Sequence, residues 1–474
     1  MLNYLLYGFG SVLLALASTK FYLKYLTYDN SEKDPDIDQS PSVKRHLARQ
    51  RFKQLNGKIK LKKNTSHLYR PRMDEDQKLD LNFLKRPLNI NTEENWVWVD
   101  GLTTYRDLVK YTMKYNKIPL VVPEFSSLTV GGVMSGVGIE SSSFKYGLTY
   151  DTVLEYEVLC GDGEIRTASP TENPDLFKAI PNSYGSFGYI ISAKLKIIDA
   201  KSYVMITPFQ FNDIEEAVEF MDKYYDSEVD FVDGIILGPN NIHIAIASMC
   251  DILNNDQSEA EEFLESFKYD IYYRRVTQDD QAILMKLEDY FWRYDYNSFF
   301  LGGIFENNMF RYFMGEELRS DNIKKIGESR LFNSLWSNKR ASIVNDLGIE
   351  LEKLPEFLEW YDQEISVYPV WLCPVLTRSD TYFFEPKDKK IVDFGIGFGV
   401  NKENTTNDPH AYEKLIDQKM AQMGARKGLY SNVFLTQEQF WDLYGPKEKY
   451  LKLKAKYDPN DRFYNLYQKT VCGI

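Results

Sequence analysis

The chain has 474 residues, of which 43% are hydrophobic and 27% are charged, and its formal net charge is −12. This composition is typical of a folded protein of two or three domains and excludes a largely disordered chain. The acidic balance, without a dense stripe of Lys and Arg, argues against nucleic acid as a partner. An anionic ligand must therefore be held by local donors.

The N-terminal segment differs from the rest of the chain. An apolar run extends from Leu5 to Ser18 and continues with apolar residues to Leu26, and Lys20 and Lys24 lie towards its end. A membrane-spanning helix needs about 20 residues. We therefore predict a membrane anchor over residues 1–28, with the body of the protein in the cytosol because the positive charges follow the apolar run. A cleaved signal peptide is the alternative, but the segment lacks a basic start.

Residues 29–54 form a polar juxtamembrane segment, and basic residues are frequent from Lys44 to Lys63. This composition suits a helix on the anionic cytoplasmic leaflet and equally a solvated helix. Both interpretations stay open.

Residues 55–200 predict one α+β unit. The stretch "RPLNINTEENWVWVDG" predicts two strands joined by a turn, and the following helix has Thr103 or Thr104 as its cap. The stretch "VLEYEVLCGDGEIRTAS" predicts a hairpin that turns at residues 161–163. In "SYGSFGYIISAKLKIID" a turn of small residues leads into a strand.

Residues 201–440 predict a second α+β unit. It begins with the strand "YVMITPFQF", the helix "DIEEAVEFMDKYYD" and a hairpin that turns at residues 239–241. Two buried strands are predicted in "ISVYPVWLCPV" and "KKIVDFGIGFGV", and a later helix closes near Gly424. A capping box at Thr436 and Gln439 predicts the start of another helix.

The stretch "SSLTVGGVMSGVGIESSSFKYGLTYD", residues 126–151, is rich in Gly and Ser. Glycine lets backbone amides approach and encircle phosphate oxygens, because it has no Cβ and adopts positive φ easily. The stretch has neither the pattern of a P-loop nor a strand-GxGxxG-helix unit. By itself it is either a structural loop or an anion-binding loop.

Cysteine and histidine residues do not form a metal-binding pattern. The four cysteines, Cys160, Cys250, Cys373 and Cys472, are far apart, and only four histidines accompany them. We therefore expect no metal centre, and thiols in a reducing compartment.

The order of several motifs resembles a known family. A helix, "PEFSSLTVGG", "KYGLTYD", the "GDG" hairpin and "GSFGYII" follow one another as in the FAD-binding domain of the vanillyl-alcohol oxidase and p-cresol methylhydroxylase (PCMH) superfamily. Within that superfamily, "LTVGGVMSGVGIESSSFKYGL", "VYPVWLCP" and "EQFWDLYG" resemble the Delta(24)-sterol reductase family, and the resemblance covers nearly the whole chain. It implies an α+β fold with a bipartite PCMH-type FAD-binding domain (residues 55–200), an α+β cap or substrate domain (residues 201–440), and a C-terminal segment (residues 441–474) that returns to the FAD domain.

The resemblance also implies which residues bind FAD. We expect the amides from Val130 to Val133 to hold the diphosphate and the "GSFGYII" block to border the adenosine. Arg70 with Pro71 matches an R-P pair that precedes the flavin loop in the family. The expected FAD-binding residues are Thr129, Val130, Gly131, Gly132, Val133, Met134, Ser135, Gly136, Val137, Gly138, Ile139, Glu140, Ser141, Gly185, Gly188 and Ile190.

The family chemistry is hydride transfer from NADPH to FAD and then to the C24–C25 double bond of a sterol side chain. An isolated double bond is a poor hydride acceptor, so protonation of one carbon must accompany the transfer. Because histidines are few, Tyr368 and Tyr430 are our candidates for the proton donor, although buried tyrosines are more often structural. The expected walls of a sterol slot are Phe291, Trp292, Tyr294, Phe299 and Trp371. The resemblance further implies a single-pass protein of the endoplasmic reticulum membrane with its catalytic part in the cytosol.

Two departures from the family pattern concern histidines. Phe144 stands where the family usually has the histidine of "S-S-S-H-K-Y-G", and Trp292 and Tyr294 stand in a region that is often "Y-Y-H-R-H-T-R". Phe144 cannot form a histidyl-flavin bond, so we expect noncovalent FAD. The true substrate stays open. The alternatives are an FAD-dependent oxidase or dehydrogenase of an alcohol or sugar lactone, and a catalytically inactive, membrane-bound sterol-binding protein.

Overall fold

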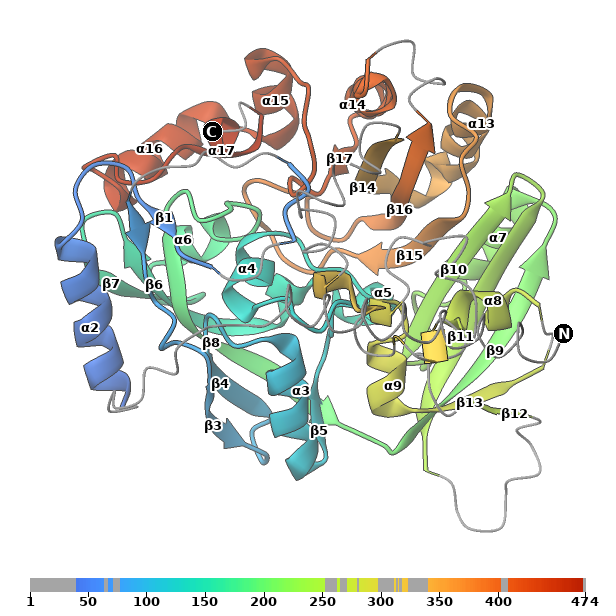
Figure 1. Ribbon diagram of the computed structural model, residues 1–474, viewed down its shortest axis with the longest axis horizontal. Coiled ribbons are helices and arrows are strands. Elements are labelled where there is room, and N and C mark those ends of the chain that lie inside the picture. Colours follow the sequence, from blue (N-terminus) through green and yellow to red (C-terminus); the bar gives the residue numbers. More distant parts are fainter. Residues whose placement is uncertain are drawn as a thin grey trace, which may run out of the picture.

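The structure is a computed structural model that describes residues 40–63, 67–70, 77–251, 262–264, 271–278, 281–296, 311–312, 314, 318–322, 340–401 and 408–471. Two α+β domains lie side by side, and the C-terminal helices lie along the upper side of the first domain (Figure 1). The predicted membrane anchor over residues 1–28 lies outside the described residues. Among the helices in the described ranges, none is long and apolar enough to cross a membrane.

The first domain is built around an antiparallel sheet in the strand order β3-β4-β8-β6-β7, and β5 pairs with β8. Its strands are β3 (Pro87–Asn91), β4 (Trp96–Asp100), β5 (Lys117–Pro119), β6 (Val153–Cys160), β7 (Ile165–Ala168) and β8 (Gly188–Asp199). In β4, Val97 and Val99 are fully buried while Trp96 and Trp98 are half-buried. This alternation is the period of two that the sequence predicts for a strand.

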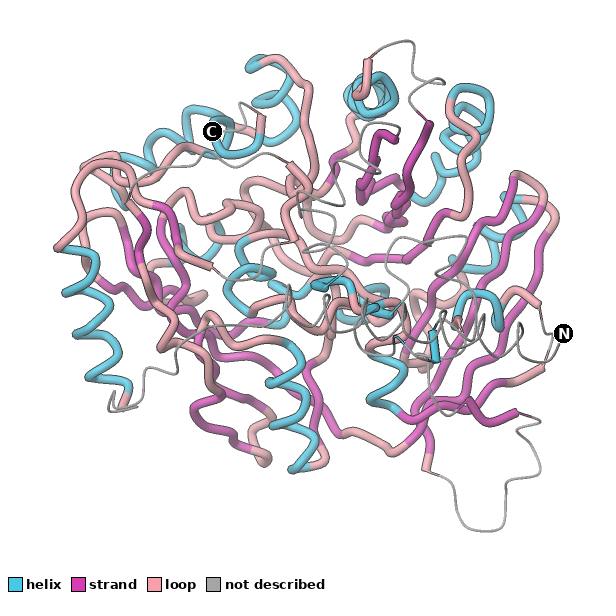
Figure 2. Tube along the Cα trace, in the orientation of Figure 1, coloured by secondary structure: helices cyan, strands magenta, loops and turns pink. Residues whose placement is uncertain are grey.

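Short helices pack around this sheet. They are α3 (Tyr105–Thr112), α4 (Val130–Ser135), α5 (Ser143–Tyr146) and α6 (Pro174–Ala179), with 3-10 turns at Met113–Tyr115 and Thr149–Thr152. Helix α3 begins at Thr104, whose side-chain oxygen accepts a hydrogen bond from the Asp107 amide, so Thr104 rather than Thr103 is the cap. The glycine-rich stretch contains α4 and α5, and short helices and loops fill the region between the two sheets (Figure 2).

Helix α2 (Pro41–Lys53) falls in the predicted juxtamembrane segment but packs against the first domain. Lys44 is buried and its amino group lies 2.5 Å from the Asp100 carboxylate, while Ala48 and Phe52 are buried on the same helix. The small parallel pair of β1 (Lys60–Leu61) and β2 (Lys78–Leu79) follows. The buried side of α2 therefore faces protein.

The second domain contains a sheet of nine strands among the described residues, in the order β12-β13-β9-β11-β10-β15-β16-β14-β17. Its strands are β9 (Tyr203–Phe211), β10 (Phe231–Gly238), β11 (Asn241–Cys250), β12 (Glu262–Leu264), β13 (Ile283–Lys286), β14 (Arg340–Glu350), β15 (Val370–Leu376), β16 (Lys390–Asn401) and β17 (Arg426–Lys427). The predicted hairpin is formed by β10 and β11 and turns at Pro239 and Asn240. The two strands predicted in the later part of the domain are β15 and β16.

The two faces of this sheet belong to two hydrophobic cores. Ile236, Leu372 and Phe394 pack in a core with helices α7 (Ile214–Asp222) and α13 (Leu354–Glu364). Side chains of the opposite face, such as Trp371, belong to the core that extends into the first domain. Because strand side chains alternate, every second residue of β15 faces the first domain. The remaining helices of this domain are α8 (Tyr272–Val276), α9 (Leu287–Phe291) and α14 (Ala411–Met423), and a 3-10 turn lies at Leu351–Lys353.

Two predicted helix ends are confirmed. Helix α14 closes at Gly424, which has a φ of 66°. The side chains of Thr436 and Gln439 form the predicted capping box, and helix α15 (Gln437–Tyr444) follows. Both signals are local, which is why the sequence carries them.

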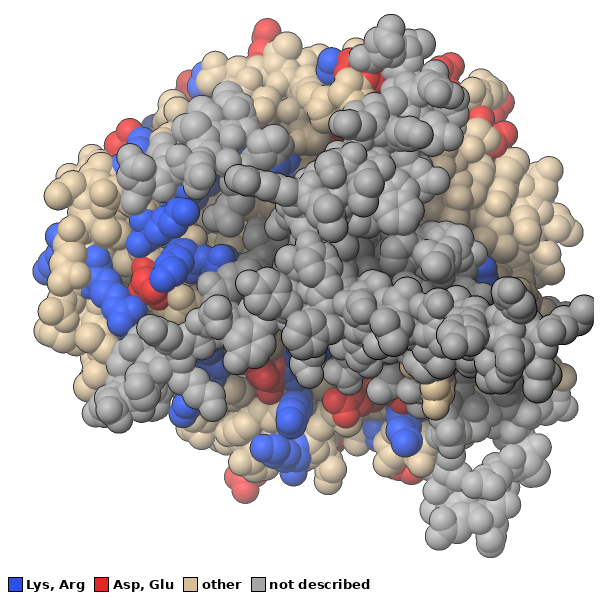
Figure 3. Space-filling view, in the orientation of Figure 1, with Lys and Arg blue, Asp and Glu red and all other residues tan. Residues whose placement is uncertain are grey.

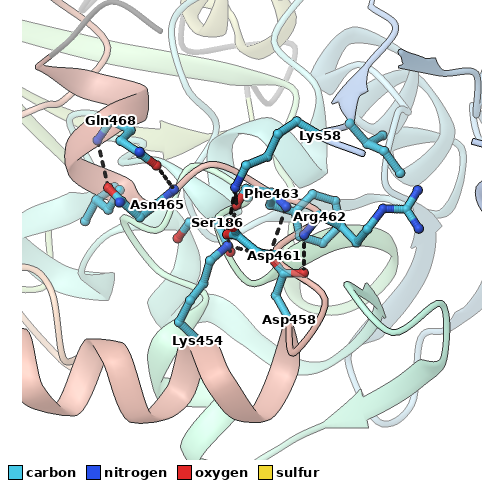
Figure 4. Close-up of polar contacts among 12 residues, drawn as sticks. Lys58, Ser186, Lys454, Asp458, Asp461, Arg462, Phe463, Asn465 and Gln468 are labelled. Atoms are coloured by element: carbon cyan, nitrogen blue, oxygen red, sulfur yellow. Dashed lines mark hydrogen bonds and ion pairs between the residues drawn. The ribbon is translucent and has the colours of Figure 1, made fainter. Parts of the chain in front are cut away.

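The C-terminal helices α16 (Lys447–Tyr457) and α17 (Leu466–Thr470) contact the first domain. The buried amino group of Lys454 donates to the carbonyl of Ser186 and to the Asp458 carboxylate, as Figure 4 shows. A Cβ at Gly161, in the "GDG" hairpin, would lie 1.9 Å from the Asp458 carboxylate. This close approach requires glycine at position 161.

Candidate active site

A cavity lies between the glycine-rich loop of the first domain, the sheet of the second domain and the C-terminal segment. It holds about 1740 Å³ of space outside the protein atoms, including solvent at its mouth. Most of the predicted FAD-binding residues line it, namely Thr129, Gly131, Gly132, Val133, Ser135, Gly136, Val137, Gly138, Ile139, Gly185, Gly188 and Ile190. The other four, Val130, Met134, Glu140 and Ser141, are buried behind its wall.

The backbone amides of the glycine-rich loop are mostly engaged within the protein. The amide of Val130 donates to Thr103, that of Gly131 to Gly101 and that of Val133 to Thr129, at 2.7 to 3.0 Å from the carbonyl oxygens. The expectation that the amides from Val130 to Val133 hold a diphosphate is therefore wrong for these three. The first two fix the loop to the segment that follows β4, and the third belongs to helix α4.

Two glycines of this loop are required by packing inside the protein. A Cβ at Gly131 would lie 2.9 Å from the Gly101 carbonyl oxygen, and one at Gly138 would lie 2.2 Å from the side chain of Val133. Any side chain at these positions displaces the loop. The glycines therefore let the loop lie flat on the first sheet, and this makes one wall of the cavity.

Lysine side chains supply positive charge at one end of the cavity. The Lys63 amino group donates to the Thr129 hydroxyl at 2.9 Å, and it lies 3.0 Å from the Cβ position of Gly132. The Lys469 amino group donates to the carbonyl oxygens of Tyr184 and Gly185 at 3.1 and 2.8 Å. Lys60 also lines the cavity, and Lys and Arg side chains gather over β1 in Figure 3. This end suits an anionic group despite the acidic net charge.

His67 and Arg70 lie on the same wall. The Nε2 of His67 is 2.8 Å from the Ser127 hydroxyl oxygen, and its ring stacks on Phe125. The Nε of Arg70 donates to the carbonyl oxygen of Leu429 at 2.9 Å. The segment before the flavin loop therefore contributes to the cavity.

Another part of the cavity wall is acidic. Glu124, Asp346 and Tyr430 line it together with Trp371, and the Tyr430 hydroxyl lies against the Asp346 carboxylate. Burial raises the pKa of Asp346 to about 6. Burial, and then the nearby Glu140 and Asp346 carboxylates, raise the pKa of Glu124 well above its usual range. These groups retain protons more readily than ordinary carboxyls do.

The register of the second sheet produces this acidic part of the wall. Asp346 on β14 and Trp371 on β15 both pair with Gly395 on β16. A Cβ at Gly395 would lie 3.1 Å from the Trp371 ring and 3.5 Å from an Asp346 carboxylate oxygen. Glycine between them therefore brings the indole and the carboxylate together on one face.

A buried arginine connects the two domains behind the cavity. Arg293 is fully buried and contacts the carboxylates of Glu140 and Asp233 at 2.6 and 2.9 Å. Its guanidinium also lies 4.1 Å from the centre of the Tyr290 ring. The Tyr294 hydroxyl donates to Asp233 at 2.9 Å. The segment from Tyr290 to Tyr294 therefore forms part of an ion-pair network between the domains.

Several residues singled out in the sequence lie away from the cavity wall. Tyr368 donates its hydroxyl to Asp362 at 3.2 Å and packs against the second-domain core. Phe144 is buried in that same core, so the residue in place of the family histidine is a packing residue. Of the expected slot residues, Trp371 lines the cavity, Phe291, Trp292 and Tyr294 are buried in the core behind it, and Phe299 lies outside the described residues.

Comparison with known proteins supports the resemblance that the sequence motifs indicate. Residues 55–169 match the FAD binding domain family. The chain is 27% identical to the Delta(24)-sterol reductase of Homo sapiens over 398 residues, which cover 81% of this chain and 76% of that protein. The chain is therefore similar to Delta(24)-sterol reductases over about four fifths of its length, and its residues 55–169 match an FAD binding domain.

Further relatives include two more sterol reductases and one protein of another name. The homolog from Caenorhabditis elegans is 26% identical over 412 residues, covering 81% of this chain and 77% of that protein. The Delta(24)-sterol reductase of Arabidopsis thaliana is 24% identical over 455 residues, which cover 83% of this chain and 76% of that protein. Cytokinin dehydrogenase 3 of Arabidopsis thaliana is 30% identical over 177 residues, which cover 34% of this chain and 32% of that enzyme.

FAD fits the cavity on structural grounds. The Lys63 amino group lies over Gly132, where any side chain would displace it, so an amine and bare backbone meet at one place. The cavity wall carries the cations Lys63 and Lys469 and also the indole of Trp371. Amines beside bare backbone suit an anionic diphosphate, and an aromatic wall suits a flat ring system.

Sequence reasoning missed the cations and the carboxyls of the cavity. Lys63 and Lys469 come from opposite ends of the chain, and Asp346 belongs to no motif. One signal was present for Glu124, because it is part of the motif "PEFSSLTVGG". No local signal marks Asp346.

Proposed function

We propose that this protein reduces the C24–C25 double bond of a sterol side chain, using noncovalent FAD and NADPH as the electron donor. The observation that carries the proposal is that one cavity is lined both by the glycine-rich stretch and by the acidic residues Glu124 and Asp346, in a chain similar to Delta(24)-sterol reductases. Bound FAD would accept hydride from NADPH and deliver it to the substrate. The protein supplies binding, position and a proton.

The FAD site is proposed on the glycine-rich wall. Lys63 and Lys469 would neutralise the diphosphate. The Lys63 amino group contacts Thr129, and the Lys469 amino group contacts Tyr184 and Gly185, so each lies at one of the two loops of this wall. Of the amides from Val130 to Val133, the amide of Gly132 remains as a candidate donor to the diphosphate. It lies next to the Lys63 amino group. Charge-assisted contacts of this kind are stronger than those between neutral groups.

Tyr430 is the proposed proton donor. It lines the cavity, whereas Tyr368 donates its hydroxyl to Asp362 at a distance from the cavity wall. Tyr430 lies beside Asp346 and near Trp371, whose indole would form one side of the slot for the sterol side chain. A proton delivered here to one carbon of the double bond makes the other carbon able to accept hydride.

The remaining elements of the proposal concern the membrane. An anchor over residues 1–28 would hold the protein at the endoplasmic reticulum membrane, with the two domains in the cytosol. Sterols partition into the bilayer, so an anchored enzyme meets its substrate there. NADPH is a soluble donor and would reach the cavity from the cytosolic side.

The test uses the full chain purified in detergent. We expect a yellow protein whose flavin absorbance is bleached by NADPH in the absence of air and restored by desmosterol, a sterol with a C24–C25 double bond. A colourless protein that takes up no FAD contradicts the flavoenzyme assignment. Flavin that NADPH leaves oxidised contradicts the reductase, and rapid reoxidation by air without response to NADPH favours an oxidase.

A further inference from the structure

We infer that Asp346, with the buried Asp393 beside it on the sheet face, forms a proton store that resupplies Tyr430 during each catalytic cycle. The inference rests on the proposed function and adds to it the source of the proton. Tyr430 would touch the substrate, and the two aspartates would act through it. They are therefore proton-supply residues rather than additional catalytic acids.

The sheet register places the two aspartates on one face. Asp393 and Gly395 are two residues apart on β16, and Gly395 pairs with Asp346 on β14. Residues in this diagonal relation on one face have Cα atoms about 7–8 Å apart, with the Cβ atoms somewhat closer. Asp346 faces the cavity, and Asp393 lies one row deeper, opposite Cys373 on β15.

Asp393 is deeply buried and has no compensating partner. Its exposed fraction is 1%, and neither carboxylate oxygen has a hydrogen-bond partner among the described residues. A carboxylate buried in this way is costly when charged, so the group retains its proton. A purely structural acid in such a place would be expected to pair with a cation, as Glu140 does with Arg293.

The neighbours of the pair come from several elements. Glu124, Tyr430 and Tyr184 face Asp346, and Cys373 faces Asp393. Arg70 brings a positive charge to this region through its contact with Tyr184. Burial, and then Asp346 and Glu124, raise the pKa of Asp393 well above its usual range. Neighbouring carboxyls disfavour one another's ionisation, so these groups titrate as a unit rather than separately.

The proton balance follows from this arrangement. Tyr430 gives its hydroxyl proton to one carbon of the double bond while hydride, derived from NADPH, adds to the other carbon. The Tyr430 oxygen then takes a proton from the Asp346 carboxyl, and Asp346, which lines the cavity, takes one from solvent there while the buried Asp393 keeps its own. One hydride and one proton add to the substrate, and solvent restores the proton of the store.

The experiment separates the two halves of the reaction in the FAD-loaded full chain. Asp346→Asn is expected to bind FAD and to be reduced by NADPH at the rate of the wild type, because that half needs no proton from the store. Reoxidation by desmosterol is expected to slow about 100-fold, the scale of a lost proton-transfer group. The exposed residue Asp388, on the connection between β15 and β16, provides the control Asp388→Asn, which should reoxidise at the wild-type rate.

The pH profile distinguishes proton supply from a structural effect. In the wild type, reoxidation should slow as pH rises through the pKa of the store, since the protonated form is the active one. Asp346→Asn should lose this inflection and Asp346→Glu should regain it. If Asp346→Asn and Asp393→Asn are both reoxidised at the wild-type rate and with the wild-type inflection, the inference is overturned. The proposed function then stays intact. If desmosterol does not reoxidise the wild type, the result contradicts the proposed function itself.

Stability offers a readout that needs no turnover. The raised pKa of Asp393 means that the folded state holds its proton more tightly than the unfolded state does. The stability of the wild type should therefore fall as pH rises from the usual pKa of 3.8 through the raised value. Asp393→Asn should flatten this fall in thermal unfolding, and an unchanged slope contradicts a buried, proton-holding Asp393.

Discussion

Two buried acidic clusters lie where the domains meet, and they differ in how their charge is balanced. In the first, Glu140 and Asp233 share the guanidinium of Arg293. In the second, Asp346 and Asp393 make no ion pair within the described ranges. The first cluster is compensated by a cation, and the second is not.

The difference separates a structural task from a chemical one. A compensated ion pair fixes Glu140, which lies within the glycine-rich stretch, against Asp233 on β10 of the second sheet, so it holds the cavity walls in place. An uncompensated carboxyl next to a cavity titrates within the range where a catalytic acid is useful. Four variants test this contrast.

Arg293→Met breaks the compensated cluster. We expect the free energy of unfolding to fall by about 3–5 kcal/mol, because two carboxylates lose their buried cation. Denaturant unfolding of the purified protein measures this effect. Arg45→Met is the control, since its pairing with Glu157 is partly exposed and is worth about 0–1 kcal/mol. Equal losses in the two variants would show that the Arg293 network is not structural.

Tyr430→Phe removes the proposed proton donor and keeps its ring. We expect reoxidation of the reduced protein by desmosterol to slow about 100-fold, with FAD binding unchanged. Tyr368→Phe provides the matched comparison, and we expect a change of less than about twofold because Tyr368 lies away from the cavity. Stopped-flow absorbance resolves both rates. A larger effect in Tyr368→Phe would reverse the assignment.

Lys63→Met removes a cation from the basic end of the cavity. We expect FAD affinity to fall about tenfold, roughly 1.4 kcal/mol, because a charge-assisted contact to the diphosphate is lost. Lys62→Met is the neighbouring control, since Lys62 contacts Asp80 at 2.8 Å instead. Titration of the apoprotein with FAD gives both affinities, and equal values would remove Lys63 from the site.

Asp393→Asn relieves the uncompensated cluster. At pH 8 we expect the free energy of unfolding to rise by about 1–2 kcal/mol, and at pH 4 we expect little change. The sign follows from the raised pKa of Asp393, whose ionisation costs stability as pH rises. Thermal unfolding at the two pH values measures the difference. Destabilisation at pH 8 would show that the carboxylate is charged and compensated.

The sequence predicted the first domain better than the acidic part of the cavity wall, for a physical reason. The glycines near Gly131, the "GDG" hairpin and the cap at Thr436 are signals within a few residues of one another. Asp346 and Asp393 meet only through the pairing of β14 with β16. A register between distant strands leaves no local trace, so their proximity needed the structure.

The distinction between local signals and tertiary packing also explains where the structure departs from the other predictions. The engaged amides of Val130 and Gly131 depend on how the loop packs on Thr103 and Gly101, which no motif states. The packing role of Phe144 likewise depends on the second sheet, against which α5 lies. Motifs therefore located the cofactor wall, and tertiary packing decided which of its atoms face the cavity.

The most direct test of the account is analysis of the sterol product. The FAD-loaded full chain is incubated without air with NADPH and desmosterol, and the sterol is identified by mass spectrometry. The account predicts a product that has gained two hydrogen atoms at the C24–C25 bond, in amounts that follow NADPH consumption. Desmosterol recovered unchanged from a protein whose flavin NADPH has reduced would contradict it.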